Sequence, residues 1–272
     1  APAPQDCSMF GQKTQPTWFF RSSGHVEAVS RLMYLVESRE PVGVITGPDG
    51  SGRTRVLERT AQELQRTGES AILMNLGGID DESALWQLAG HLCCNVRSSL
   101  RRHELLTALR DELAGRGQCG QHTTLLLDDL HRSEIEEGVF LRFLTGIALS
   151  GSCPLTVIAS ARHEIPPELA EHVYVPIRLQ RLNATESAVF VRELLQRLGL
   201  PPGACDEQSV RETAAQGGGL PARLFRICDL IQVYALAWPG TPITVDIVRS
   251  LAAELAPAVD DSRLLRPVLK MA

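Results

Sequence analysis

The stretch from Gly47 to Thr54 is the part of the sequence whose residue types and spacing most directly suggest chemistry. It reads Gly-Pro-Asp-Gly-Ser-Gly-Arg-Thr and fits the pattern G-x-x-x-x-G-K-[ST], except that Arg53 stands where the pattern has lysine. Glycines let successive backbone N–H groups turn toward a phosphate at the start of a helix, whose dipole favours an anion. We call residues 47–54 the glycine loop and predict that it binds phosphate; the alternative is a plain strand-to-helix turn.

The predicted ligand of this loop is a nucleotide, ATP with Mg²⁺. Thr54 supplies a hydroxyl ligand for the metal ion, and the nucleotide contacts are assigned to the loop and the residue after it: Gly47, Pro48, Asp49, Gly50, Ser51, Gly52, Arg53, Thr54 and Arg55. Lysine would place a compact charge at the terminal phosphates, whereas arginine is longer and forked. Arg53 can still hold phosphate oxygens, so binding can survive while the positioning needed for phosphoryl transfer is weakened.

A second candidate element is the apolar run 125–127, which ends in the two carboxylates Asp128 and Asp129. Asp128 would hold Mg²⁺, and Asp129 would orient or deprotonate an attacking water. Glutamate is the usual residue at the second position, and the shorter aspartate moves the carboxylate by about 1 Å, enough to cost on the order of 10²-fold in rate. The alternative is that both acids simply end a strand.

Two single residues complete the candidate site. Ser160 follows an apolar strand and could contact the terminal phosphate or the water, although serine there is also an ordinary turn residue. Arg223 opens a helix after Gly217-Gly218-Gly219 and could reach the phosphate, or could be a surface arginine. His131 follows the two acids closely enough to contact the site. The candidate catalytic residues are therefore Asp129, Arg53, Ser160 and Arg223.

The elements that position these residues alternate between strand and helix. Apolar runs predict strands ending at Gly47 and over 70–76, 123–128, 155–159 and 173–177. Helical periodicity begins at Ser23 and recurs at 57–64, 82–94 and 102–114, where Gly115 and Gly117 end the helix; Ser133 and Glu136 form a capping box for the next. Strands this apolar, separated by helices, predict a parallel sheet covered on both faces, a three-layer αβα core of the doubly wound type.

After Arg178 the sequence predicts helices alone. Asn183 and Glu186 form a capping box, Gly217–Gly219 separate the second helix from the third, Pro221 starts the third, and Thr244 caps the fourth. The predicted domains are a lead-in over 1–17, an α/β core over 18–180, a small all-helical lid over 181–260 and a tail over 261–272.

Composition excludes several classes of protein. The 272 residues carry 27 Lys+Arg against 32 Asp+Glu, a net charge of -5, which argues against a polybasic nucleic-acid binder. The one basic cluster, Arg97 with residues 101–103, suits the solvated start of a helix. No apolar run approaches the ~18 residues of a membrane span, and no basic segment leads into an apolar one, so we expect a cytoplasmic protein. Seven cysteines without a C-x-x-C pair predict neither a disulfide framework nor a zinc ribbon.

Several motifs taken together resemble one family. They are Trp18-Phe19-Phe20, His25-x-Glu27-Ala28, the glycine loop, LLLDD at 125–129 and GGGLPARLFRICD at 217–229. In this combination, over roughly residues 18–235, the chain resembles the AAA+ ATPases of the general secretion pathway A type, which are related to bacterial transposition ATPases. The resemblance implies a nucleotide between the core and the lid, with hydrolysis coupled to their relative movement.

The chain departs from that family at three places. Arg53 replaces the loop lysine. The family usually has arginine directly after the lid proline, but Ala222 follows Pro221 here, and Arg223 lies about 100° further around the helix. AAA+ rings also use an arginine from the neighbouring subunit, usually between the fourth and fifth strands, and the stretch 163–177 contains none, with Arg162 and Arg178 at its edges.

The leading expectation is therefore an ATP-binding AAA+ protein with slow or partner-stimulated ATPase activity. One alternative is a catalytically degenerate scaffold gated by nucleotide, and a second is a DNA-associated ATPase of the transposition type, although the net charge leads us not to expect nucleic acid. The resemblance implies a protein partner that is membrane-anchored or envelope-spanning, a location at the periphery of the inner membrane through that partner, and a homo-oligomer.

Overall fold

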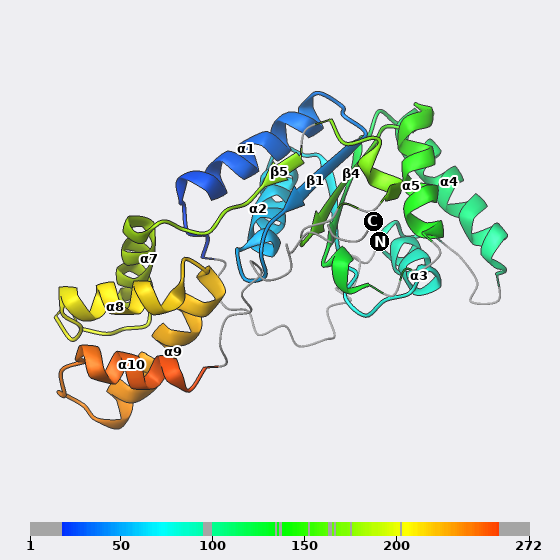
Figure 1. Ribbon diagram of the computed structural model, residues 1–272. Coiled ribbons are helices and arrows are strands. Elements are labelled where there is room, and N and C mark those ends of the chain that lie inside the picture. The colour runs from blue at the N-terminus through cyan, green and yellow to red at the C-terminus, as the bar shows by residue number, and fades with distance from the viewer. Residues whose placement is uncertain are drawn as a thin grey trace, which may run out of the picture.

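The structure is a computed structural model of the chain, shown in Figure 1. It describes residues 18–255 apart from 95–99, 134, 136–137, 152, 163–164, 166, 175 and 202. The predicted lead-in 1–17, the tail 261–272, the last residues of the predicted lid, Arg97 and Glu136 lie outside the described residues.

Five parallel strands form one sheet in the order β2-β3-β4-β1-β5. Every residue of β1, β3 and β4 is buried, as expected for apolar strands of a sheet covered on both faces. Because the strands are parallel, the carboxyl ends of β1, β4 and β3 lie side by side, at the edge where such folds bind ligands. The strands are β1 (Val42–Thr46), β2 (Ser70–Asn75), β3 (Thr123–Asp128), β4 (Leu155–Ala161) and β5 (Pro176–Arg178).

Helices cover both faces of this sheet. Alternate side chains of β3 separate the two cores: Leu126 packs in one cluster with α1 and α2, whereas Leu125 and Leu127 pack in the other with α3, α4 and α5. The predicted three-layer αβα class is thereby confirmed. The covering helices are α1 (Ser23–Glu37), α2 (Arg53–Arg66), α3 (Asp81–His91), α4 (Arg102–Gln118) and α5 (Val139–Ser150).

Three predicted boundaries in this layer are wrong. Helix α4 continues through both glycines to Gln118, and a Cβ at Gly117 would collide with the Pro154 ring, so the glycine allows close packing. Helix α5 starts at Val139, because Asp81 of α3 accepts a hydrogen bond from Phe140 N–H at 2.6 Å. Strand β5 begins at Pro176 and pairs only with β1, the edge position where proline is tolerated.

Ser133 was predicted to start α5, but its side chain acts in the turn before that helix. Its hydroxyl donates to the Leu130 carbonyl at 2.7 Å and so closes the short 3-10 turn η1 (Leu130–Arg132), six residues before α5 begins. The same two-residue pattern works at Asn183, whose side chain accepts from Glu186 N–H at 2.8 Å while the Glu186 carboxylate accepts from Asn183 N–H.

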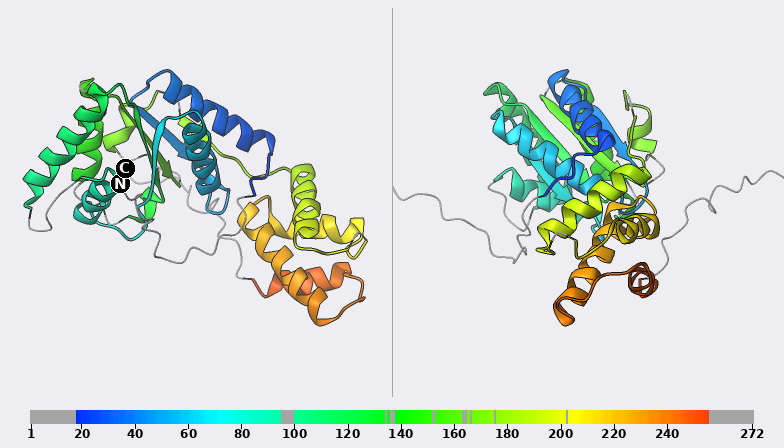
Figure 2. Two further views of the ribbon diagram at one scale, coloured as in Figure 1. Left: turned by 180° about the vertical axis from the view of Figure 1, so that it is seen from behind. Right: turned by 90° about the vertical axis from the view of Figure 1, so that its left-hand side faces the viewer.

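The short helix α6 (Pro167–Ala170) lies between β4 and β5 in the sequence. After β5 the chain forms a region of helices with its own apolar core. Figure 2 shows this region beside the sheet layer, at the end where α1 begins. Trp18 and Phe20 pack on Phe190 of this region, with ring centroids 5.0 Å apart in each case. The helices are α7 (Ala184–Arg197), α8 (Glu207–Gly217), α9 (Pro221–Ala237) and α10 (Val245–Ala253). The domain boundary at residue 180 stays a prediction.

None of the helices that the structure describes has the length and apolar character needed to cross a membrane.

His122, just before β3, makes the fold sensitive to pH. Its side chain is buried, and Nε2–H donates to Thr156 Oγ1 at 3.0 Å, because that hydroxyl itself donates to the Glu40 carbonyl. Nδ1 is buried without a partner, and burial together with the Arg39 charge lowers the pKa of His122 from 6.5 to about 4. The native state therefore holds His122 neutral, while the unfolded chain binds the proton below its ordinary pKa.

We expect stability to be highest above the unfolded pKa and to fall as pH drops toward the folded one. Between about pH 7.5 and 5.5 the His122 contribution falls by roughly 1 kcal/mol. Denaturant unfolding at several pH values measures this, and His122→Gln should flatten the dependence, while His103→Gln, at an exposed histidine, should leave it unchanged. Equal slopes for wild type and His122→Gln would contradict the assignment.

Candidate functional site

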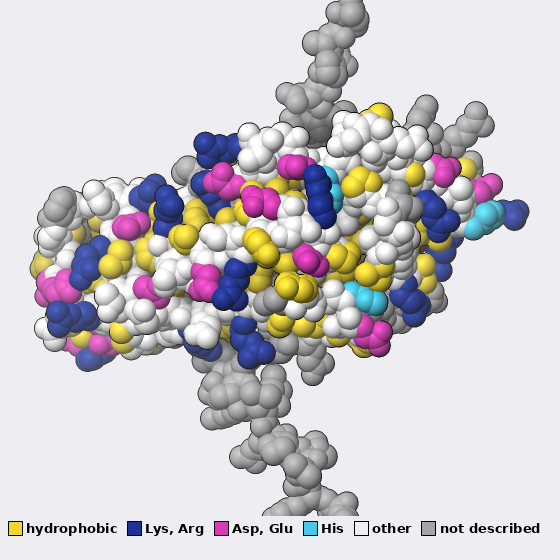
Figure 3. Space-filling model, turned by 90° about the horizontal axis from the view of Figure 1, so that it is seen from above, with side chains coloured by type: hydrophobic (Ala, Val, Ile, Leu, Met, Phe, Trp, Pro, Cys, Tyr) yellow, Lys and Arg dark blue, Asp and Glu magenta, His cyan; other side chains and the backbone are white. Residues whose placement is uncertain are grey.

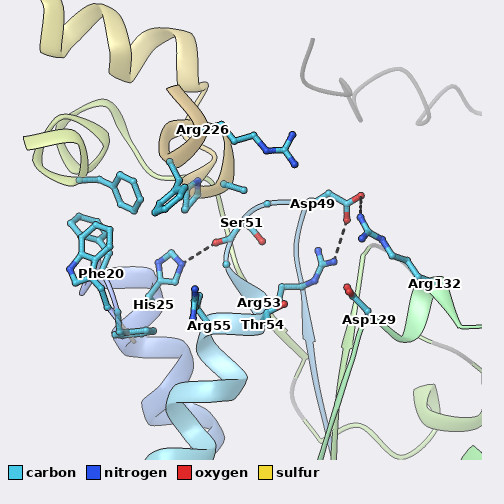
Figure 4. Close-up of a pocket in the computed structure, with 18 residues that line it drawn as sticks. Phe20, His25, Asp49, Ser51, Arg53, Thr54, Arg55, Asp129, Arg132 and Arg226 are labelled. Carbon is cyan, nitrogen blue, oxygen red and sulfur yellow. Dashed lines mark hydrogen bonds and ion pairs between the residues drawn. The ribbon is translucent and has the colours of Figure 1, made fainter. Parts of the chain in front are cut away.

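A cavity of about 460 Å³ lies between the carboxyl edge of the sheet and the helical region; we call it the loop pocket (Figure 4). Figure 4 shows aromatic side chains at one end of the pocket and charged side chains at the other. It is lined by Trp18, Phe19, Phe20, His25, residues 49–55, Asp129, Arg132, Phe190, Pro221, Ala222, Phe225 and Arg226.

The glycine loop joins β1 to α2 in a conformation that needs its glycines. Gly50 and Gly52 have positive φ angles of 78° and 100°, and a Cβ on Gly52 would lie 2.6 Å from His25 Nε2. Gly52 caps α2 without any side-chain hydrogen bond, so the first N–H groups of this helix have no capping side chain and are available to an anion.

Arg53 folds back onto its own loop. Its side chain is only 6% exposed; Nη1 donates to the Gly47 carbonyl and Nη2 to Asp49 Oδ1 at 3.3 Å. The remaining nitrogen, Nε, is buried without a partner. The guanidinium is therefore held by acceptors of the loop, and a contact between Arg53 and phosphate stays a prediction.

The acids at the end of β3 are held by Ser160 of β4. The buried Ser160 hydroxyl donates to Asp128 Oδ1 at 2.5 Å and accepts from Asp129 N–H at 3.0 Å. Ser160 thus positions both acids, and its predicted contact with phosphate or water stays untested. Asp129 has a φ of 53° and lines the pocket.

Asp128 and Thr54 have the chemistry of a Mg²⁺ site. Asp128 is 2% exposed, and its Oδ2 atom is buried with no hydrogen-bond partner. Thr54 lies in the first turn of α2, exposed and lining the pocket. A buried carboxylate oxygen left without a donor suits a hard cation that takes oxygen ligands, so these residues fit the metal.

The other loop residues have separate roles. The Pro48 carbonyl accepts from Ser51 N–H at 3.1 Å, Gly47 N–H donates to the Arg162 carbonyl at 3.1 Å, and Arg55 pairs with Glu58 on the exposed side of α2 at 2.8 Å. The structure thus brings residues 49–55 and Asp129 to the same pocket, whereas Gly47, Pro48 and Asp128 are not among its lining residues.

The predicted lid arginine, Arg223, lies away from the residues that line the pocket, and its role stays a prediction. Arg223 Nε donates to the Gln216 carbonyl at 2.9 Å, and this side chain is not among those lining the pocket. Arg226, one turn beyond Ala222, lines the pocket and extends from α9 toward its charged end (Figure 4). Helical phase was the available signal, since Ala222 and Arg226 are four residues apart and share a face.

Sequence reasoning also gave no site role to the aromatic end of the pocket or to Arg132. Trp18, Phe19, Phe20 and Phe225 were part of the family resemblance only, and Phe190 belonged to no motif. His25, whose Nε2–H donates to the Ser51 carbonyl at 3.0 Å, was likewise a motif residue without an assigned role.

A parallel sheet in this order, with a glycine loop between β1 and α2 and a helical region over the carboxyl edge, defines a P-loop fold of the αβα type. A family described as an AAA domain matches residues 36–169. The chain is 22% identical over 238 residues to General secretion pathway protein A of Aeromonas hydrophila, covering 84% of this chain and 43% of that protein. It therefore spans less than half the length of this relative.

Solved structures show the same fold. Cdc6p from Pyrobaculum aerophilum has a TM-score of 0.72 at 16% identity, covering 92% of this chain and 72% of that one. The Drosophila ORC bound to DNA has a TM-score of 0.71 at 16% identity, with 93% and 70% covered. The Thermotoga maritima RuvB Holliday junction branch migration motor has a TM-score of 0.57 at 16% identity, covering 87% of this chain and 70% of that one. Residues 36–169 thus match the AAA domain family, and most of the chain is similar to General secretion pathway protein A.

The link from Ser160 to Asp128 can be tested by stability. Ser160→Ala removes a buried hydrogen bond to a carboxylate and should lower the free energy of unfolding by about 2 kcal/mol. Ser187→Ala is the matched control, because the Ser187 hydroxyl is equally buried but has no partner, and it should stay within about 0.5 kcal/mol of wild type. Denaturant unfolding compares the two, and equal losses would show that Ser160 does not anchor the acids.

Proposed function

We propose that the loop pocket binds ATP with Mg²⁺ and that the chain is a slow or partner-stimulated ATPase. The observation that carries this proposal is the division of the pocket into an aromatic end and a glycine-loop end (Figure 4). A nucleotide is divided in the same way, into a base that stacks on aromatic rings and a polyanion that needs backbone N–H groups and cations. The cavity volume is in the range of about 300–1,000 Å³ typical of small-molecule sites.

The charge of the lining supports a polyphosphate ligand. Four arginines (Arg53, Arg55, Arg132 and Arg226) and two aspartates (Asp49 and Asp129) line the pocket, a surplus of two positive charges. The whole chain, in contrast, has a net charge of -5. Positive charge is therefore concentrated where a phosphate chain would lie.

Mg²⁺ would be held by Thr54 and Asp128, with phosphate and water supplying its other ligands. When bound, the ion neutralises charge on the phosphates. Asp129, held at its backbone by Ser160, would orient or deprotonate the attacking water through its carboxylate. Arg226 takes the role that the sequence gave to Arg223, a cation reaching the phosphates from the helical lid.

The contact between the lid and the loop supports coupling of nucleotide state to lid movement. Ala222 N–H, at the start of α9, donates to the Gly50 carbonyl at 3.1 Å. A change in loop conformation on phosphate binding would alter this hydrogen bond and so shift the lid. We retain residue 180 as the proposed boundary between the core and the lid. A movement of this kind could be passed to a protein partner.

Similarity to General secretion pathway protein A leads us to propose a membrane-anchored or envelope-spanning protein partner, a cytoplasmic location at the inner membrane, and a homo-oligomer. Nucleic acid is not the favoured ligand. Figure 3 shows basic and acidic side chains interspersed over the visible face, and the exposed Arg101, Arg102 and His103 form only a short cluster at the start of α4.

One observation favours the nucleotide-gated scaffold as a second candidate. The Arg53 guanidinium is engaged by Gly47 and Asp49, so the residue that replaces the loop lysine is held within the loop. Such a loop can bind nucleotide without positioning its terminal phosphate for transfer.

A paired measurement separates the ATPase from the scaffold: ATP affinity with Mg²⁺ by calorimetry, and phosphate release by the same sample. We expect binding with slow release, and Asp128→Ala should abolish release because it removes the buried metal ligand. Asp111→Ala, at an exposed acid of α4, is the control and should change neither quantity. Binding without release would favour the scaffold, and absence of both would refute nucleotide binding.

Arg53→Lys tests the cost of the loop arginine. A lysine ammonium concentrates its charge at one point, so we expect phosphate release to rise several-fold, up to about tenfold, with little change in ATP affinity. Arg59→Lys, on the same helix and paired with Glu63, should leave both unchanged. A rate in Arg53→Lys that is equal to or below that of wild type would contradict the idea.

A further inference from the structure

Asp49, the third residue of the glycine loop, is surrounded by basic groups from three segments of the chain. Its Oδ1 lies 3.3 Å from Arg53 Nη2 and 3.3 Å from His131 Nε2. Its Oδ2 lies 3.5 Å from Arg132 Nη2 and 3.6 Å from Arg162 Nε. Burial alone would raise the pKa of Asp49, but the hydrogen bond from Arg53 and the charges of its other basic neighbours hold that pKa below its ordinary value.

A carboxylate at this position is unfavourable for a phosphate-binding loop taken alone, because it brings a negative charge to the place where an anion should bind. The four basic groups change this. They form a site that already prefers an anion, and in this structure the anion is a side chain of the loop itself. Figure 4 shows Asp49 between Arg53 and Arg132, with Asp129 nearby.

Arg132 differs from the other members of this cluster. Its side chain is 58% exposed, against 26% for Arg162 and 16% for His131, and it lines the loop pocket beside Asp129. It follows β3 in the short turn η1, so it approaches the charged end of the pocket from the side of the Asp128–Asp129 acids. Of the basic residues around Asp49, Arg132 is thus well placed to exchange one anion for another.

We propose that Asp49 stands in for the terminal phosphate of the nucleotide, and that Arg132 moves from Asp49 to that phosphate when a nucleoside triphosphate binds. This inference rests on the proposed function. The terminal phosphate offers three acceptor oxygens and a larger charge than a carboxylate, and a guanidinium can hold two of those oxygens at once. Arg132 then supplies, within one chain, a cation of the kind that AAA+ rings take from a neighbouring subunit, and it distinguishes ATP from ADP.

The test compares Mg²⁺-ATP and Mg²⁺-ADP affinities of the full chain, its Arg132→Gln variant and its Asp49→Asn variant. Arg132→Gln should weaken ATP binding about tenfold and ADP binding less than about threefold, since only ATP carries the terminal phosphate. Asp49→Asn should tighten ATP binding several-fold, because it removes the competing anion. In the double variant, which combines Asp49→Asn with Arg132→Gln, this gain in ATP affinity should disappear, since Arg132 is then absent.

Arg66→Gln is the matched control. This arginine is 73% exposed at the far end of α2, and its loss should change neither affinity. Arg132→Lys should recover part of the preference for ATP, which a merely structural role would not require. The preference should also be the same at high and at low protein concentration, because Arg132 acts within its own chain.

The outcomes separate the inference from the proposed function. Equal weakening of ATP and ADP in Arg132→Gln, an unchanged ATP affinity in that variant, weaker ATP binding in Asp49→Asn, or a preference for ATP that vanishes on dilution would each overturn the inference while nucleotide binding stands. Failure of the wild-type chain to bind either nucleotide would overturn both.

Discussion

The close approach of α9 to the glycine loop is the constraint on which the rest of the site depends. Ala222 N–H donates to the Gly50 carbonyl, and a Cβ on Gly50 would lie 2.9 Å from the Ala222 Cβ. Residue 50 must therefore be glycine and residue 222 small for the lid to reach the loop. A second glycine, Gly219, accepts from Leu182 N–H at 2.8 Å and would clash with the Leu182 carbonyl if it carried a Cβ. The first contact joins the helical region to the glycine loop, and the second holds the start of α9 against residue 182 within the helical region.

The start of α1 makes a second connection across the same pocket. The Ser23 hydroxyl donates to the Glu186 carboxylate of α7 at 2.8 Å, while His25 Nε2–H donates to the Ser51 carbonyl. Ser51 offers only an acceptor there, so His25 carries its proton on Nε2 and accepts from the Ser22 hydroxyl on Nδ1. Burial lowers the pKa of His25, which favours this neutral form. The adjacent carbonyls of Gly50 and Ser51 are thus hydrogen-bonded to two different helices, α9 and α1. A rotation of either peptide group would therefore disturb the contacts of the loop with both helices.

The sequence predicted the elements whose signals are local. Strands β1, β3 and β4 were found as apolar runs because each is buried on both faces, and α7 was found because both members of its capping box lie within four residues. The errors arose where a distant residue decides the outcome. Asp81 sets the start of α5, Pro154 requires the glycine within α4, and neither is near its partner in sequence. The glycine loop and the two acids were predictable because their signals are local. The surroundings of Asp49 were not, because Arg132 and Arg162 are distant from it in sequence. Arg226 had a local signal in its helical phase, which the sequence analysis did not use.

Asp49 and Arg53 show why a motif should not be read one residue at a time. Considered alone, arginine in place of the loop lysine suggests a degenerate site. Asp49, four positions earlier, accepts a hydrogen bond from Arg53, and the Gly47 carbonyl accepts a second one from Arg53. The buried guanidinium therefore has a partner at each of its two terminal nitrogens. The two unusual residues of the loop are therefore one feature. Arg132, which follows β3, and Arg162, which follows β4, reach the same carboxylate, so this feature ties the loop to the strand ends that hold the acids. The charge balance around Asp49 is therefore a property of three segments and not of the loop alone.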